Sequence, residues 1–141
     1  MVDLATLTAL RERVIAAKGP DQKLDSAIWL KTSHQCKDHG IDGWTKYTAS
    51  IDAALALVGR MLPGHGWSVG SDFARQGQPF ATIGYDEEDR RGSAFAHTPP
   101  LAILAALLSA LIAMETARNR RTEIEPNINP YAAIIPKGSK L

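Results

Sequence analysis

The sequence has a single cysteine, few aromatic residues and almost no net charge. One thiol cannot form a disulfide within the chain, which fits a reducing cytoplasm. Sixteen basic and fifteen acidic residues leave a net charge of +1, so no global field favours nucleic acid or an anionic membrane. No charged segment precedes an apolar core at the N-terminus, so we expect a cytoplasmic and not a secreted protein.

Long hydrophobic runs are also absent. The uncharged run Leu101–Met114 is shorter than the ~20 residues that span a bilayer, so no membrane partner is expected. Hydrophobic residues make up 45% of the chain and charged residues 22%, which excludes wholesale disorder. A chain of 141 residues has the length of one folded domain, which we place over residues 1–118.

Apolar periodicity predicts an α+β fold. Helical spacing alternates with strand spacing along the chain, and turn residues separate the segments. The order α-α-α-β-β-β-α predicts a three-stranded antiparallel sheet packed with helices in layers. The expected elements are helices over 3–18, from 21 and over 50–62, strands over 67–73, 80–85 and 93–97, and a helix that starts at Pro99 after the capping residue Thr98.

The last predicted helix has two different apolar halves. Bulky residues such as Leu104 and Leu107 lie on one half, which we expect to pack on the sheet. The other half is small and uncharged for four turns, so we expect another helix or a second subunit to cover it, a solvated alanine face being the alternative. The residues of this predicted interface are Ala102, Ala105, Ala106, Ser109 and Ala113.

Widely spaced prolines follow Arg118. Pro126, Pro130 and Pro136 predict that residues 119–141 form an extended C-terminal arm. The arm carries an apolar patch that we expect to dock on the body or on a neighbouring subunit. The patch residues assigned to the interface are Tyr131, Ile134 and Ile135.

Two motifs suggest chemistry but lack its context. His34, Cys36 and His39 are metal-ligand types, yet their spacing matches no closed zinc site, so we expect a solvated loop and no metal or other cofactor. Residues 66–70 match G-x-S-x-G, with Asp72 and His97 as nominal partners of Ser68. That motif requires a strand followed by a helix, whereas here a helix comes first. We therefore expect no enzyme.

Anion binding is a third possibility. The order helix–strand–strand–strand–helix over 50–118 is that of double-stranded RNA-binding domains. Residues 99–103 carry no basic side chain, so duplex binding is not expected. A helix N-terminus near cations suits a small anion instead. The candidate ligand-binding residues, in a pocket between subunits, are Tyr47, Arg75, Arg90, Arg91, His97 and Thr98.

Four segments together resemble a known family. Gly19-Pro20-Asp21, the run over 47–58, Gly66-Trp67-Ser68-Val69 and the segment from Gly92 to Ala102 resemble the phage ABA sandwich domain family, over roughly residues 19–115. The resemblance implies a layered helix–sheet–helix arrangement, an α-β-α sandwich, and supplies no catalytic residues. The motif residues themselves are interpreted as structural: Ser50 and Thr98 as caps, and Trp67, Ile51, Leu55 and Leu101 as packing residues.

The functional expectation combines these points. We expect a non-enzymatic accessory protein of a phage or prophage that is cytoplasmic in the host bacterium. We expect it to bind a host or phage protein and to form a homo-oligomer. The alternative is sequestration of a small anionic ligand, for instance a nucleotide signal of host immunity.

Overall fold

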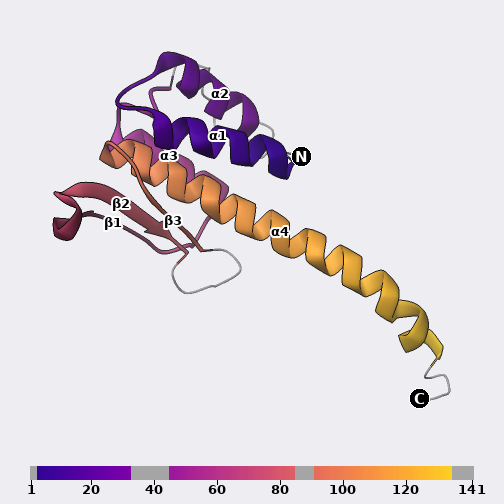
Figure 1. Ribbon diagram of the computed structural model, residues 1–141. Coiled ribbons are helices and arrows are strands. Elements are labelled where there is room, and N and C mark those ends of the chain that lie inside the picture. The colour runs from indigo at the N-terminus through magenta and orange to yellow at the C-terminus, as the bar shows by residue number, and fades with distance from the viewer. Residues whose placement is uncertain (1–2, 33–44, 85–90, 135–141) are drawn as a thin grey trace.

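The elements follow the predicted order. The computed structural model describes residues 3–32, 45–84 and 91–134, with side chains described as far as Arg121. Together with the sheet below, this order confirms the α+β class (Figure 1). The elements are helices α1 (Leu4–Ala16), α2 (Gln22–Thr32) and α3 (Ile51–Met61), strand β1 (Trp67–Asp72), the short 3₁₀ helix η1 (Phe73–Arg75), strands β2 (Gln78–Ile83) and β3 (Gly92–Phe95), and helix α4 (Pro99–Ile134).

Side-chain caps fix where the first three helices begin. The Asp3 carboxylate accepts a hydrogen bond from the Thr6 amide at 2.7 Å, and Ser50 Oγ accepts one from the Ala53 amide at 3.1 Å. Asp21 does the same for the Leu24 amide at 3.1 Å. Each bond satisfies an amide that has no partner within its helix, so the caps predicted at positions 3 and 50 are confirmed.

The cap of α1 makes its stability depend on pH. Hydrogen bonds from Thr6, first from its side chain and then from its backbone, lower the pKa of Asp3 below the ordinary value of 3.8, and Lys31 adds to this. The ionised carboxylate therefore stabilises α1 fully above pH 3.8, and the stabilisation is lost as the pH falls through the lowered pKa. We expect the Thr6 amide resonance to titrate with a midpoint below 3.8. A midpoint at or above that value would contradict the cap, and Asp3→Asn should remove the titration.

The three strands form an antiparallel sheet in the order β1-β2-β3. Residues directly opposite one another share a face, so the register assigns each side chain to one side of the sheet. The side that faces α4 carries Ala81 and Ile83 from β2 and Gly92 and Ala94 from β3, and all four are buried. This face and α4 form the centre of the core.

Helix α4 lies between the sheet and α1 (Figure 1). Both of its apolar halves are buried as far as Ala110, except at the half-buried Ser109. The cover predicted for the alanine half comes from α1 and β3 of the same chain: Arg11 of α1 donates a hydrogen bond to Ser109 at 2.5 Å, and the β3 residue Gly92 lies against the α4 backbone at Ala106 and Ala110. The assignment of Ala102, Ala105 and Ala106 to a subunit interface is therefore wrong.

The layers are stacked differently from an α-β-α sandwich. The labelled helices lie on one side of the sheet, and the order of layers is sheet, α4, then α1 (Figure 1). The physical reason is that α4 is apolar on both halves, so it occupies the middle layer and the remaining helices pack on it. The other face of the sheet has no helix over it among the described residues.

The helical backbone of α4 continues to Ile134, so the prediction of an extended arm is wrong over residues 119–134. The chain after Met114 contains good helix formers, and Glu115 pairs with Arg118 one turn later. A proline removes one helical hydrogen bond and favours a kink, and in this helix it does not end the element. The distal part of α4 projects beyond the body (Figure 1). The backbone at Tyr131 and Ile134 is helical, and Ile135 lies outside the described residues.

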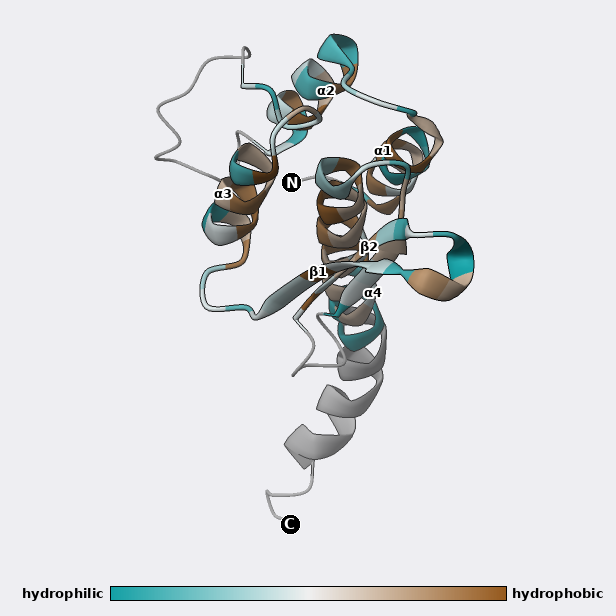
Figure 2. Cartoon of the chain, turned by 90° about the vertical axis from the view of Figure 1, so that its left-hand side faces the viewer, coloured by the Kyte–Doolittle hydropathy of each residue, from teal (hydrophilic) through white to brown (hydrophobic). Residues whose placement is uncertain are grey.

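The Pro99–Arg121 part of α4 is long and apolar enough to cross a membrane by length and composition alone. A buried core helix meets the same criteria, and 56% of the apolar window is buried within this protein. Figure 2 shows the change from hydrophobic to hydrophilic residues where the helix leaves the body. The burial fits the role of a core helix.

Two residues expected to pack in the core are exposed. Trp67 is 48% exposed, because α4 lies mainly over β2 and β3 and leaves the edge strand β1 largely uncovered. Ile51 is 43% exposed, because α3 turns a neighbouring stripe inward, made of Ala54, Leu57 and Val58. Leu55 is partly buried and Leu101 is fully buried, as predicted.

Candidate functional site

The face of the sheet opposite α4 is the most distinctive surface among the described residues. The register places on it every second residue of each strand. Two of these residues are phenylalanines on neighbouring strands, which is an unusual position for large apolar side chains on a face without a covering helix. The residues of this open face are Ser68, Gly70 and Asp72 from β1, Gln78, Phe80 and Thr82 from β2, and Ser93 and Phe95 from β3.

The two aromatic rings pack against each other. The centroids of Phe80 and Phe95 lie 5.8 Å apart with the planes tilted by 48°, within the range of favourable aromatic pairs. On the other side of Phe80 lies Gly70, where a Cβ atom would stand 3.3 Å from two carbons of the ring. The absence of a side chain at Gly70 thus gives the ring room to lie flat against β1.

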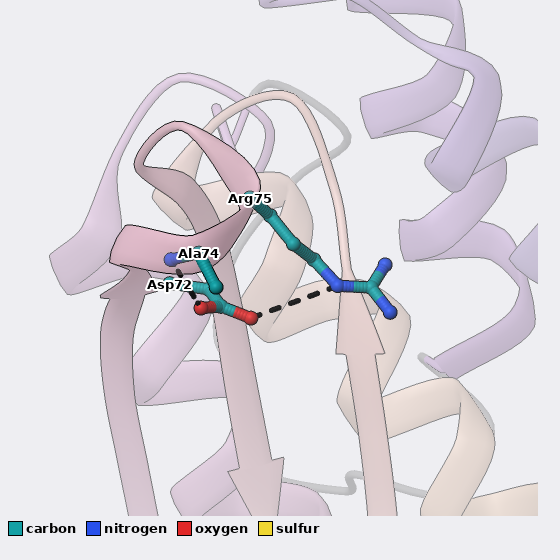
Figure 3. Close-up of polar contacts among 3 residues, drawn as sticks. All are labelled: Asp72, Ala74 and Arg75. Carbon is teal, nitrogen blue, oxygen red and sulfur yellow. Dashed lines mark hydrogen bonds and ion pairs between the residues drawn. The ribbon is translucent and has the colours of Figure 1, made fainter.

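An arginine covers the outer end of this aromatic pair. Arg75 reaches from η1 toward β3 (Figure 3). Its guanidinium carbon lies 4.3 Å from the centroid of Phe95. Asp72 holds the same guanidinium, with 3.6 Å between Oδ2 and Nε, while its other oxygen accepts the Ala74 amide at 2.9 Å. The five residues Gly70, Asp72, Arg75, Phe80 and Phe95 form one surface, which we call the Phe95 platform.

The turn between β1 and β2 determines the position of Arg75. Gln76 has φ 60° and Gly77 has φ 79°, so two successive left-handed residues reverse the chain directly after η1. The Gly77 amide donates to the Asp72 carbonyl at 2.8 Å and closes the turn. The backbone therefore fixes both partners of the Asp72–Arg75 ion pair.

All three phenylalanines of the chain lie outside the buried core. Phe80 and Phe95 are half-buried on the platform, and Phe73 in η1 is 97% exposed. Exposed aromatic residues that cluster on one surface mark interaction sites. The prediction from sequence places Phe80 in a strand but does not assign alternate residues of that strand to its two faces. That assignment would have placed Phe80 on the same face as its neighbours in the platform.

The predicted ligand-binding residues are not brought together. Tyr47 is 1% exposed and belongs to the core, so its ring is not available to stack on a ligand. Arg75 and the exposed His97 lie toward one end of β3, whereas Arg91 precedes the other end. Within one chain the structure does not bring Tyr47, Arg75, Arg91 and His97 into a single site, and Arg90 lies outside the described residues.

The N-terminus of α4 has few amides to offer an anion. Pro99 and Pro100 have no N–H group, and the next amide, of Leu101, lies 3.4 Å from Thr98 Oγ1. The Ala102 amide bonds the Thr98 carbonyl at 2.9 Å. Thr98 is confirmed as a helix cap. Because its hydroxyl oxygen already accepts a hydrogen bond from the helix, it is less suited to bind a ligand.

The metal prediction lies mostly outside the described residues. His34, Cys36 and His39 fall in the segment 33–44, which the structure does not describe. Among the residues that are described, no group of three histidine, cysteine, aspartate or glutamate side chains is placed to hold a metal ion.

Comparison with protein-family models, with curated proteins and with solved structures finds no match for this chain.

Proposed function

We propose that this protein is a non-enzymatic binding protein whose Phe95 platform contacts a protein partner. The observation that carries the proposal is the packing of two phenylalanines and one guanidinium on a sheet face that no described helix covers. Aromatic residues and arginine are the types enriched at the energetic centres of protein interfaces.

The arrangement suits binding because it is organised before a partner arrives. Asp72 and the ring of Phe95 restrict the guanidinium of Arg75, so less side-chain entropy is lost on association. The polar residues Ser68, Gln78 and Ser93 surround the rings on the same face. An apolar centre with a polar rim is the common anatomy of a protein–protein interface.

The resemblance to the phage ABA sandwich domain family supplies the proposed biological setting. On this basis the protein is an accessory protein of a phage or prophage that acts in the cytoplasm of the bacterial host and binds a host or phage protein. The proposal of a platform does not depend on that setting, because it rests on the contacts among the described residues.

Sequestration of a small anionic ligand ranks second. Tyr47 is buried, Arg75 is paired with Asp72, and Pro99 and Pro100 leave α4 without its first two amides. These three facts remove most of the donors that such a ligand would use. A rise of several degrees in the melting temperature on addition of a nucleotide would reverse this ranking.

Substitution of the platform rings tests the main proposal. The partner is first captured and then produced recombinantly. We expect Phe95→Ala and Phe80→Ala each to weaken its binding by about 30-fold or more, because loss of a hot-spot residue costs about 2 kcal/mol of binding free energy. Isothermal calorimetry measures the loss. Leu30→Ala on α2 is the matched control, since Leu30 is an exposed apolar residue of a different element.

The result depends on comparison between variants. Equal affinity of the wild-type protein and both phenylalanine variants would refute the platform as the binding surface. Circular dichroism and thermal melting of each variant separate lost contacts from lost folding.

A further inference from the structure

The outer edge of β1 carries unpaired backbone groups. The Gly84 amide donates to the Gly66 carbonyl at 2.7 Å, and antiparallel pairing alternates from there, so even-numbered residues of β1 direct their backbone groups to β2. Trp67, Val69 and Ser71 then direct their N–H and C=O groups to the outside. In the described part of the chain no other strand pairs with this edge.

Within β1 itself, this edge has none of the sequence features that usually protect an exposed strand. Strand β1 pairs with β2 over six residues without a bulge, and it contains no proline or lysine. Its one charged residue, Asp72, stands at the end of the strand. Strand β3, the opposite edge, is shorter, with four residues. Strand β1 is thus the longer of the two edges of this sheet.

The helix-facing side of β1 is also incomplete. Trp67, Val69 and Ser71 share this side with their partners across the register, Ile83, Ala81 and Pro79. Helix α4 covers mainly β2 and β3, which leaves Trp67 half exposed beside the open edge. Another strand at this edge would cover the indole ring.

We infer that β1 pairs antiparallel with β1 of a second copy of this chain, with Val69 on the twofold axis. An outward-facing residue forms a hydrogen-bonded pair only with another outward-facing residue. The register centred on Val69 pairs Val69 with itself and Trp67 with Ser71, so it uses all three outward residues of both copies. A register shifted by two residues in either direction would pair only two of the three outward-facing residues of each copy.

Charge and side-chain size fit the same register. The strand is its own complement, because its large residue Trp67 comes to lie opposite its small residue Ser71. The two Asp72 carboxylates stand at opposite ends of the paired strands, each opposite Gly66 of the other copy, so no like charges meet. The chemistry at this edge therefore favours a second copy over a strand of unrelated sequence.

The pairing has a consequence for the open face of the sheet. A twofold axis perpendicular to the sheet keeps equivalent faces on the same side, so the six-stranded sheet would present both Phe95 platforms to one side. Two such surfaces in one particle would bind a multivalent partner with higher avidity. The dimer itself rests on the β1 edge and does not depend on the proposed function.

Removal of one outward amide tests the pairing. Proline at an edge position whose N–H points outward leaves the ladder to β2 intact. We expect light scattering to give twice 15.3 kDa for the wild-type protein at ~100 µM and for Ser71→Thr, and 15.3 kDa for Ser71→Pro. A wild-type protein that stays at 15.3 kDa, or a Ser71→Pro variant that still dimerises while folded by circular dichroism, would overturn the inference.

Cysteine crosslinking tests the register and does not require proline. In a Cys36→Ser background, residue 69 faces its own copy at about 5.5 Å between Cα atoms, within the range of a disulfide. We expect Val69→Cys to give a crosslinked dimer under mild oxidation. Ser71→Cys is the control, since its copies stand four residues apart, about 13 Å, and it should stay monomeric on a non-reducing gel. Equal crosslinking of both variants would overturn the register.

Discussion

Replacement of Gly92 by alanine is expected to lower the free energy of unfolding by about 3 kcal/mol, at the upper end for insertion of a group into a packed core. A Cβ atom at this position would stand 2.1 Å from the carbonyl oxygen of Ala106 and 2.3 Å from the amide nitrogen of Ala110. Both atoms belong to the backbone of α4, so no side-chain rotation relieves the overlap. Strand β3 and α4 would have to separate.

Thermal and urea denaturation measure this loss, with a decrease of about 10 °C expected in the melting temperature. Gly59→Ala is the matched control, because Gly59 lies within α3 and an added Cβ meets no atom within 4 Å. Alanine is favoured over glycine inside a helix by up to about 1 kcal/mol, so the control should be as stable as the wild-type protein or more so. A Gly92→Ala variant as stable as Gly59→Ala would show that β3 does not approach α4 so closely.

Local sequence signals predicted the elements well. The caps at Asp3, Ser50 and Thr98 act within one turn of their helices, and the alternation around Val69 extends over neighbouring residues only. Such signals are present in the sequence itself, because the interacting groups are a few residues apart. The class and the order of the elements follow from them.

The arrangement of the layers was not predictable in the same way. The sequence shows that both halves of α4 are apolar, but it does not show whether the cover over Ala105 is α1 or a second copy. Nor does it show which side of β2 faces α4, because Phe80 and Ala81 are both apolar. The platform depends on that choice of side and on contacts between Arg75 and Phe95, which are twenty residues apart.

A buried polar network is a second feature that local patterns did not reveal. Asp25 is a buried residue of α2, and its carboxylate accepts a hydrogen bond from the Thr48 amide at 2.7 Å. Thr48 Oγ1 in turn accepts the Asp21 amide at 2.8 Å. These bonds join the start of α2 to the segment before α3, across more than twenty residues of sequence. Asp21, Asp25 and Thr48 therefore have a structural role.

Loss of the Asp25 carboxylate is expected to lower the free energy of unfolding by about 2–3 kcal/mol. In Asp25→Ala the buried Thr48 amide loses the carboxylate that accepts its hydrogen bond. Asp25→Asn keeps an acceptor oxygen and should lose less, while Asp52→Ala at an exposed position of α3 should change stability by only a few tenths of a kcal/mol. Urea denaturation of the three variants measures the series. Equal stability of Asp25→Ala and Asp52→Ala would mean that the network does not hold α2 to the segment before α3.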